Sequence, residues 1–381
     1  MSAHRGAPAS TQVSAAAENA TEDQRFMALA LSLGRRGLGR TWPNPAVGAV
    51  IVKHGVVIGR GWTQAGGRPH AEIEALGRAG AGARGATMYV TLEPCSHHGK
   101  SPPCADAVIA AGISRVVSAL EDPNPEVAGG GHARLRKAGI AVEIGVGAEA
   151  AGRAHAGHIR RMRDGRPHVM LKLAISADGK VGAAGPKPVA ITGEAVRDRV
   201  HLLRAQHDAI MIGIGTALTD DPILTCRLPG LAKASPIRIV LDGALRLPLG
   251  SRLAQTARET PVWVIAGPKP TPAAEEALWL QGVEVMRAGE SGGRLDLAAV
   301  LKLLATAGVT RLMVEGGPTL AAALIAADLV DEAILFHSAK TIGASGIDAL
   351  GGGAMATLTQ RLKHVKSKPA GPDRQDFYER G

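Results

Sequence analysis

Aromatic residues are scarce in this chain: Phe, Trp and Tyr make up 2% of its 381 residues. Unpaired nucleic-acid bases are commonly bound by stacking on such rings, and no RNA-binding motif accompanies the basic residues here. The formal charge of +10 comes with a composition rich in Ala, Gly and Arg. We therefore expect no nucleic-acid partner. A solvated basic surface explains the charge, and it also suits a phosphorylated small molecule.

Long apolar runs are also missing. No segment approaches the roughly 20 apolar residues needed to cross a bilayer, and residues 1–20 lack the basic-then-apolar pattern of a secretory signal. We expect no membrane partner. Only three cysteines are present, which excludes a disulfide framework and fits a reducing, cytoplasmic compartment. Cys226, the one outside the motif described below, is predicted to be a small buried residue.

The length suits two domains, each large enough to bury a stable core. We expect a disordered head over residues 1–21, a first domain over 22–150, a linker with a short helix over 151–167 and a second domain over 168–381. The first helix is predicted to begin at Thr21, which stands in capping-box relation to Gln24.

Apolar periodicity predicts alternating strands and helices in both halves, and hence α/β layers. In the first half, strands are predicted at 47–53 and 56–62, joined by a turn at His54-Gly55, and then at 87–92, 115–120 and 142–146. In the second half, strands are predicted at 168–176, 208–213, 237–242, 261–266, 282–289, 311–317 and 331–337, with a final strand pair over 364–380 and helices at 193–206, 295–308 and 318–328.

The most specific motif is His70-Ala71-Glu72 followed by Pro94-Cys95 and then Cys104. A catalytic zinc takes three imidazole or thiolate ligands and leaves a fourth position for water. His70, Cys95 and Cys104 are the predicted ligands. Glu72, in the same first helical turn as His70, is left to carry protons. A structural zinc would need a fourth ligand and would have no use for Glu72. The motif therefore predicts hydrolytic deamination.

Eight residues, SHHGKSPP, separate the two cysteines, where the general deaminase signature has two. The segments TLEPCSHHGKSPPC, TWPNPAVGAVIV and DPNPEVAGGG resemble the deaminase domain of the bifunctional riboflavin biosynthesis deaminase/reductase family. The resemblance implies a cytidine-deaminase-like α/β/α fold over residues 22–150. The rival reading, a nucleic-acid deaminase acting on tRNA or single strands, is opposed by this spacing.

The same resemblance implies the substrate and the residues that bind it. Zinc-activated water would attack the amino-bearing carbon of a diaminopyrimidinone ribosylamine phosphate, while Glu72 takes the water proton and passes it to departing ammonia. Asn44 would orient the pyrimidine, and His97 and Lys100 would approach the substrate. Thr63 stands where the family commonly has a substrate-lining histidine. His97 as a loop histidine in water and Lys100 as a solvated charge are the alternatives.

Residues 168–381 resemble the reductase domain of the same family, through LKLAISADGK, LLRAQHDAIMIGIGTALTDDPILTCR, IRIVLDG and LMVEGGPTLAAALI. This implies a dihydrofolate-reductase-like fold and NADPH. Gly316-Gly317 lies between a strand and a helix, where backbone N–H groups bind phosphate, and Gly213-x-Gly215 is a second glycine turn at the end of a strand. Neither turn is a Rossmann fingerprint. The implied NADPH contacts are Ala174, Ala190, Thr216, Asp220, Gly243, Gly317, Pro318, Thr319, Leu320, Ala321, Ala322 and Ala323.

Five residues would face the substrate of the second domain by the same resemblance: Pro188, Arg204, Leu224, Arg227 and Glu315. The two arginines suit its 5′-phosphate by charge and fork geometry. Surface ion pairs are the alternative for the arginines, and a helix cap is the alternative for Glu315.

The second domain departs from the family pattern at Pro188-Val189-Ala190 and at Gly243. A deaminase whose reductase half has decayed therefore stands as the rival to a bifunctional enzyme, and these positions bear on the preference for NADPH over NADH. We also expect a homo-oligomer, although no sequence feature sets its order.

Overall fold

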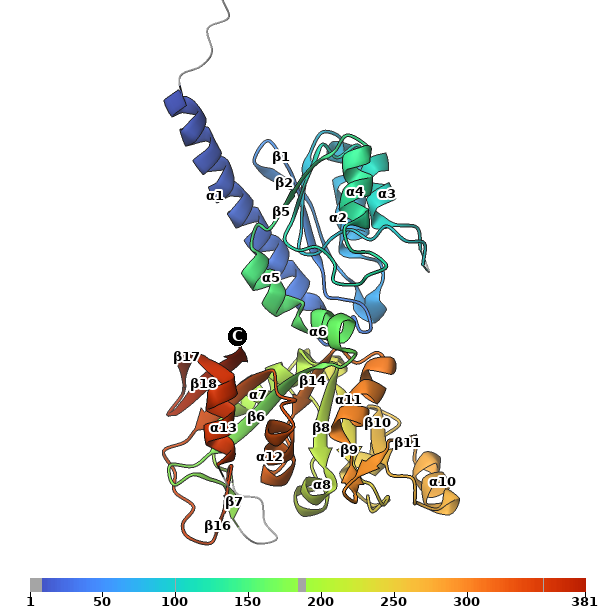
Figure 1. Ribbon diagram of the computed structural model, residues 1–381, viewed down its shortest axis with the longest axis vertical. Coiled ribbons are helices and arrows are strands. Elements are labelled where there is room, and N and C mark those ends of the chain that lie inside the picture. The colour runs from blue at the N-terminus through green and yellow to red at the C-terminus, as the bar shows by residue number, and fades with distance from the viewer. Residues whose placement is uncertain (1–8, 100, 184–189, 352) are drawn as a thin grey trace, which may run out of the picture. The chain divides into compact units, whose positions relative to one another are not determined.

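The computed structural model describes residues 9–99, 101–183, 190–351 and 353–381. The chain divides into two compact units; the first ends at Arg163 and the second begins at Asp164. Each unit is built on one main β-sheet flanked by helices (Figure 1). Within the described residues, no helix combines the length and the hydropathy needed to cross a membrane. The mixed α/β class expected from the strand and helix periodicity is confirmed for both units.

The first unit holds a five-stranded sheet. Its order is β2 (Val56–Trp62), β1 (Gly48–Lys53), β3 (Thr87–Val90), β4 (Arg115–Ser118) and β5 (Ala141–Ile144). The β1–β2 hairpin turns at His54-Gly55, both at positive φ, as a two-residue hairpin loop requires. β1 also pairs antiparallel with β3, whereas β3, β4 and β5 run parallel.

Helices cover both faces of this sheet. One face carries α2 (Ala71–Ala79), α3 (Cys104–Ala110) and α4 (Gly130–Lys137), and the other carries α1 (Ala9–Gly34) and α5 (Ala148–Ala154) (Figure 1). Separate apolar clusters fill the two interfaces: Ile51, Met88 and Val116 face α2–α4, while Val50, Tyr89 and Val117 face α1 and α5. Strand residues alternate between the two clusters, as a period of two requires. The predicted three-layer α/β/α fold is confirmed.

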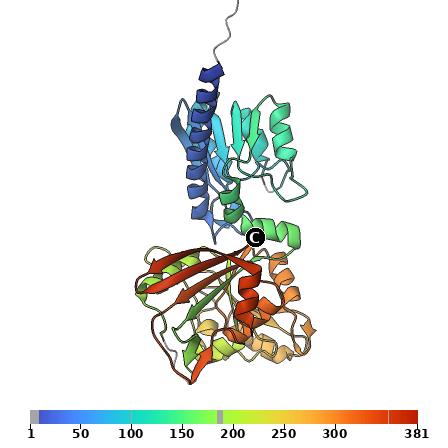
Figure 2. The same ribbon diagram turned by 60° about the vertical axis from the view of Figure 1, so that its left-hand side comes forward.

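Helix α1 corrects the predicted start of the fold. It begins at Ala9, so residues 9–21, expected to be disordered, are helical, and Thr21 lies inside the helix instead of capping it. Residues 1–8 lie outside the described residues. Alanine stands at positions 15–17 and 20, and its high helix propensity explains why the helix continues past the capping-box sequence. Figure 2 shows α1, in blue, running along the sheet of the first unit.

The segment expected to be a linker, 151–167, contains the end of α5 and all of α6 (Ala156–Asp164). Most of it belongs to the first unit. Two buried histidines attach it there: His155 Nε2 lies 3.0 Å from Thr91 Oγ1, and His158 Nε2 lies 2.9 Å from Asp122 Oδ1. The expected linker is therefore largely a packed part of the first unit, because its polar side chains find partners in the sheet and its loops.

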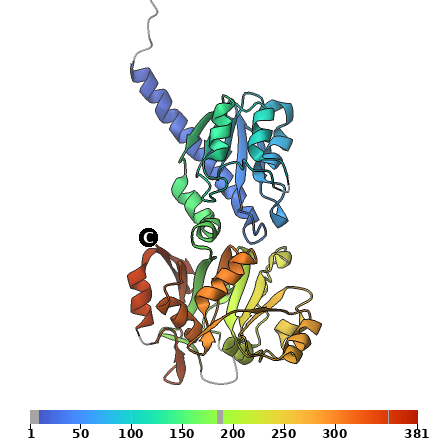
Figure 3. The same cartoon turned by 45° about the vertical axis from the view of Figure 1, so that its right-hand side comes forward.

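The second unit holds a nine-stranded sheet. Its order is β11 (Glu284–Arg287), β10 (Val262–Ala266), β9 (Ile237–Leu241), β8 (Ala209–Gly213), β14 (Arg311–Val314), β6 (His168–Ile175), β15 (Glu332–His337), β18 (Asp373–Arg380) and β17 (Leu362–Ala370). The strands from β11 to β15 run parallel, and the β17–β18 hairpin adds two antiparallel strands. In Figure 3 the red hairpin and the orange helix α10 (Pro272–Leu280), which contacts β11, lie towards opposite edges of this sheet.

The remaining elements of this unit connect or cover the strands. The helices are α7 (Glu194–Ala205), α8 (Ile214–Asp220), α9 (Arg252–Gln255), α11 (Leu297–Thr306), α12 (Pro318–Ala326) and α13 (Ala354–Arg361). Two small ribbons pair β7 (Lys180–Ala183) with β16 (Gly346–Asp348), and β12 (Glu290–Ser291) with β13 (Arg294–Leu295). α8 follows β8 and α12 follows β14, so the starts of both helices lie at the same end of two adjacent parallel strands.

Arg238 of β9 is a fully buried arginine that fastens a loop to the sheet. Its guanidinium donates to the carbonyls of Ile223, Thr256 and Thr260 and to Thr256 Oγ1, with distances of 3.2 Å to Ile223 O and 2.9 Å to Thr256 O. Removing these donors would leave several partly buried carbonyls without a hydrogen bond. Each buried group left unpaired costs about 1–3 kcal/mol of stability.

We therefore expect Arg238→Met to lower the free energy of unfolding by about 2–4 kcal/mol, since the apolar stem is kept and the donors are lost. Urea denaturation of the full chain measures the change. Arg294→Met, made at an exposed arginine of the same unit, is the control. Equal stability of the two variants would contradict the stabilising role of the Arg238 hydrogen bonds.

Candidate functional site

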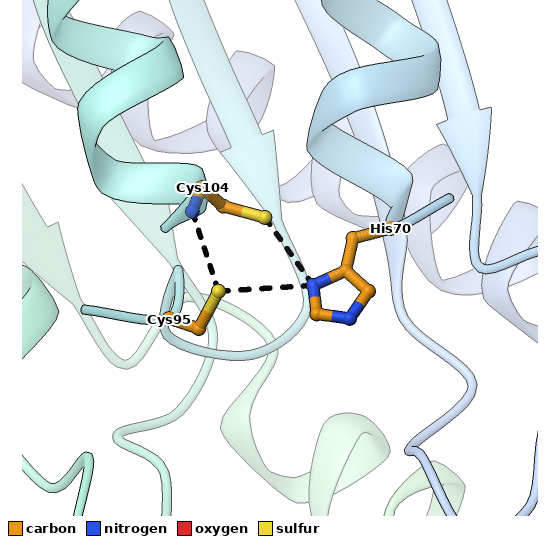
Figure 4. A group of neighbouring side chains, drawn as sticks. All are labelled: His70, Cys95 and Cys104. Carbon is orange, nitrogen blue, oxygen red and sulfur yellow. Dashed lines mark hydrogen bonds between the residues drawn. The ribbon is translucent and has the colours of Figure 1, made fainter. Parts of the chain in front are cut away.

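The first candidate site lies in the first unit, where three metal-ligand side chains converge (Figure 4). His70 immediately precedes α2, Cys95 lies in the loop after β3, and Cys104 is the first residue of α3. His70 Nδ1 lies 3.3 Å from Cys104 Sγ and 3.7 Å from Cys95 Sγ. All three ligand atoms lie within 4.8 Å of one another. The structure thus brings the three predicted ligands together.

These separations fit zinc. Tetrahedral zinc with usual Zn–N and Zn–S bonds separates a nitrogen and a sulfur ligand by about 3.6 Å. The Cys104 backbone N–H donates to Cys95 Sγ at 3.3 Å, so the start of α3 stabilises the thiolate. The hydrogen bond from the Cys104 thiol and the contact with His70 lower the pKa of Cys95, against the opposing effect of burial. A lowered pKa favours the thiolate, which is the form of cysteine that binds zinc.

Glu72 lies one residue beyond the start of α2, and its side chain is buried in the same site. Burial is the main effect that raises the pKa of its carboxyl, while the positive charge of His70 opposes the rise. A carboxyl group whose pKa is moved towards neutrality is suited to general acid–base catalysis. Glu72 is accordingly placed to take up and release protons beside the three metal ligands.

A cavity of about 200 Å³ opens on this cluster. Of the residues predicted from the family resemblance, Asn44 and His97 line it, and Asn44 Nδ2 donates to Gly67 O at 2.9 Å. Thr63 also lines it and accepts a hydrogen bond from the Val47 N–H. Lys100 lies outside the described residues.

Sequence reasoning missed several residues of this cavity. The additional polar lining comes from Arg68, Glu93, Asp122, Asn124, His158 and Arg161. Asp122 and Asn124 belong to the segment DPNPEVAGGG, which carried part of the family resemblance, so a signal for them was present. Arg68 also had a signal, because it precedes His70 by two residues. His158 and Arg161 had none, because only the folded chain brings their helix to the metal cluster.

The second candidate site is a cavity of about 520 Å³ in the second unit. Its lining includes eight of the residues predicted from the resemblance: Ala174, Thr216, Asp220, Glu315, Gly317, Pro318, Thr319 and Leu320. A Cβ atom built on Gly213 or Gly215 would meet no atom within 4 Å, so bare backbone borders open space there. The Gly317 N–H donates to Thr216 Oγ1 at 3.2 Å, which joins the two glycine turns.

This lining fits a dinucleotide phosphate. The nine-residue helix α12 begins at Pro318, and the backbone N–H groups and dipole at a helix start favour negative charge. Glycines on the adjacent turn let a ligand approach the backbone closely. The residues present are therefore those that would hold the phosphates of a nicotinamide cofactor.

An ion cluster borders the same cavity. Arg204 donates to both carboxylate oxygens of Glu315, with Nε 2.7 Å from Oε1 and Nη2 3.0 Å from Oε2. Lys172 Nζ lies 3.8 Å from Glu315 Oε2. Burial alone would raise the pKa of Glu315, but the two cations hold it at about 2. Burial lowers the pKa of Lys172. Glu315 thus remains an anion, and Lys172 gives up its proton more readily than an exposed lysine.

Lys172 was not singled out in the sequence, although a lysine inside the apolar strand HVMLKLAIS is a recognisable signal. The register explains its position. β14 pairs with β6 so that Val314 lies opposite Leu171, and the next residues along the two parallel strands are Glu315 and Lys172.

Several predicted contacts of the second unit lie away from this cavity. Leu224 is buried in the apolar core, and the exposed Arg227 is not among the lining residues. Ala190 accepts a hydrogen bond from Lys340, and Gly243 lies beside Glu290. Ala321, Ala322 and Ala323 continue α12 beyond the lining. Pro188 lies outside the described residues.

Comparison with known proteins identifies a family for both halves of the chain. Residues 20–120 match the family model "Cytidine and deoxycytidylate deaminase zinc-binding region", and residues 167–375 match the model "RibD C-terminal domain". Riboflavin biosynthesis protein RibD of Escherichia coli K12 is 42% identical over 365 residues, covering 92% of this chain and 98% of that protein. The RibD of Aquifex aeolicus is 39% identical and covers 91% and 94%.

Solved structures are similar over nearly the whole chain. RibD of Acinetobacter baumannii superposes with a TM-score of 0.84 at 36% identity, covering 95% of this chain and 99% of that one. A Thermotoga maritima protein described as a diaminohydroxyphosphoribosylaminopyrimidine deaminase/5-amino-6-(5-phosphoribosylamino)uracil reductase gives 0.82 at 32% identity, covering 95% and 100%.

Proposed function

The chain belongs to the family of riboflavin biosynthesis protein RibD, and on that basis we propose how its two sites divide a two-step reaction. The site of the first unit catalyses the hydrolytic deamination of 2,5-diamino-6-ribosylamino-4(3H)-pyrimidinone 5′-phosphate at zinc. The site of the second unit catalyses the NADPH-dependent reduction of the ribosyl group to ribityl. The observation that carries this proposal is the presence, in one chain, of the His70–Cys95–Cys104 cluster with Glu72 and of the glycine-bordered cavity with Glu315.

In the first unit, His70, Cys95 and Cys104 would hold zinc, which when bound supplies the Lewis acidity that activates water near neutral pH. Glu72 moves the protons. Its carboxylate takes one from the attacking water and delivers it to the amino group that leaves as ammonia. Asn44 and His97, which line the same cavity, orient the pyrimidine so that its amino-bearing carbon faces Glu72.

In the second unit, NADPH supplies the reducing equivalents when bound. Thr216, Asp220 and the start of α12 from Gly317 to Leu320 would hold its phosphates and ribose. Glu315, kept anionic by Arg204 and Lys172, accepts hydrogen bonds from the sugar hydroxyls of the substrate. Lys172 is the cavity's nearby proton donor, because burial lowers its pKa. The positions of Leu224 and Arg227 do not support direct substrate contacts for these two residues.

A single coupled assay tests the proposal. Purified zinc-loaded protein is given the diaminopyrimidinone substrate and NADPH, and ammonia release and NADPH oxidation are followed together. Both signals are expected, with ammonia first. Ammonia without NADPH oxidation would favour the rival reading, a deaminase with a decayed reductase half, which the departures at Ala190 and Gly243 keep open. A parallel run with NADH measures the cofactor preference.

Removal of zinc should separate the two activities. After treatment with a chelator, we expect ammonia release to stop and to return when zinc is added, because the activated water depends on the metal. NADPH oxidation should continue when the deaminated compound is supplied directly, since the second cavity contains none of the zinc ligands. Undiminished ammonia release by protein shown to be metal-free would contradict the zinc assignment.

We also propose that the enzyme works in the cytoplasm as a homo-oligomer on a small-molecule substrate, without a nucleic-acid or membrane partner. The absence of paired cysteines among the described residues supports a reducing compartment. Light scattering of the purified chain measures the oligomeric state. A mass equal to one chain across the working concentration range would refute the oligomer.

A further inference from the structure

One cation of the deaminase cavity, Arg68, has no carboxylate partner among the described residues. Three carboxylates line this cavity, Glu72, Glu93 and Asp122, together with two arginines, Arg68 and Arg161. Within the described parts of the chain, no carboxylate lies at ion-pair distance from Arg68, whose hydrogen-bond partner is the neutral hydroxyl of Ser101. Arg68 is therefore a candidate for binding an anionic group of the substrate.

The carboxylates of the cavity are already engaged. Glu93 is buried and accepts four backbone N–H groups, two on each oxygen, at 2.8–3.1 Å. Asp122 Oδ1 is bonded to His158 Nε2 and to the Asn124 N–H, each at 2.9 Å. Glu72 is buried beside the three metal ligands. None of the three pairs with Arg68, so its guanidinium has no carboxylate to balance its charge in the part of the chain that the structure describes.

The position of Arg68 suits the far end of the substrate. It precedes His70 by two residues and bonds Ser101 in the loop between the two zinc cysteines, so it stands beside the metal cluster without belonging to it. Arg161, on α6, has a partner within the protein. When the pyrimidine carbon faces Glu72, the ribosyl phosphate extends away from the metal, and a phosphate dianion pairs well with a guanidinium fork.

We propose that Arg68 binds the 5′-phosphate of the deaminase substrate and thereby sets the preference for a phosphorylated compound. This inference rests on the proposed function and deepens it. Ser101 holds the guanidinium from one side through Nη1, which leaves its other N–H groups for the phosphate. The phosphate would then lie beside both Arg68 and Ser101.

The test compares Arg68→Met and Arg68→Lys on two substrates, the ribosylamine 5′-phosphate and the same compound without its phosphate. For the phosphorylated substrate, Arg68→Met should raise KM about tenfold to a hundredfold, the usual effect of losing charge-assisted hydrogen bonds, with a much smaller change in kcat. Arg68→Lys should restore part of the loss. The kcat/KM for the dephosphorylated compound should change by less than about twofold.

Arg60→Met, made at an exposed arginine of β2 outside the cavity, is the matched control. Zinc content and NADPH oxidation with supplied deaminated compound show whether each variant is folded and metal-loaded. Equal losses on both substrates, or a phosphate-specific loss in Arg161→Met in place of Arg68→Met, would overturn the assignment of Arg68. Absence of ammonia release by the unmodified protein would instead overturn the proposed function itself.

Discussion

Glu72→Gln should release ammonia at least about a thousandfold more slowly than the unmodified protein, within the range expected for removing a general acid–base. Glutamine keeps the shape of the side chain but cannot take a proton from water. His70, Cys95 and Cys104 are untouched, so metal analysis should still find zinc. Steady-state ammonia release with the diaminopyrimidinone substrate is the measurement.

The chain offers a matched control for this change. Glu74 lies on the same helix and bonds Arg78, but it does not line the cavity. Glu74→Gln should deaminate normally. NADPH oxidation with supplied deaminated compound should be unaffected in both variants. Ammonia release by Glu72→Gln at a near-normal rate would contradict the role of Glu72 in proton transfer.

Glu315→Gln should reduce NADPH oxidation by about a hundredfold or more while ammonia release stays normal. A neutral amide leaves Arg204 and Lys172 buried without their anion, and breaking a buried ion pair on one side typically costs about 3–5 kcal/mol. The substrate also loses a charged acceptor for its sugar hydroxyls. Stopped-flow or steady-state absorbance of NADPH with deaminated substrate measures the loss.

Glu332→Gln separates a specific effect from a general one. Glu332 is a largely buried carboxylate of the same unit, and burial raises its pKa, but it does not line the cavity. The Glu332→Gln variant should therefore oxidise NADPH at the normal rate. If Glu315→Gln retains full reductase activity, or loses deamination equally, the assigned role of Glu315 is wrong.

Much of the first site could be predicted from sequence because its members lie at the ends of strongly patterned elements. His70 and Glu72 share the first turn of one helix, and Cys104 opens another. Local chemistry and spacing were sufficient there. The predicted helix start at Thr21 was wrong because a second local signal outweighed the capping box. The alanine-rich stretch before Thr21 favours helix, and the helix begins at Ala9.

The charged cluster of the second site was harder to predict. Arg204 and Glu315 are 111 residues apart, and their two hydrogen bonds depend on how α7 and the end of β14 lie in the fold. Lys172 joins them only because β6 and β14 are neighbours in register. Neither strand order nor register is encoded by periodicity alone.

The amino-acid sequence by itself determined the chemistry of the first reaction, the two-part α/β organisation and the family, because motif spacing and apolar periodicity are local properties. The tertiary structure alone decided which distant charges meet. It paired Glu315 with two cations, and it gave Glu93 and Asp122 hydrogen-bond partners. Among the residues that the structure describes, it left Arg68 beside the metal cluster without a carboxylate partner. The physical reason is that an ion pair or a cavity forms between side chains from separate elements, and only the packing of those elements sets the distance between them.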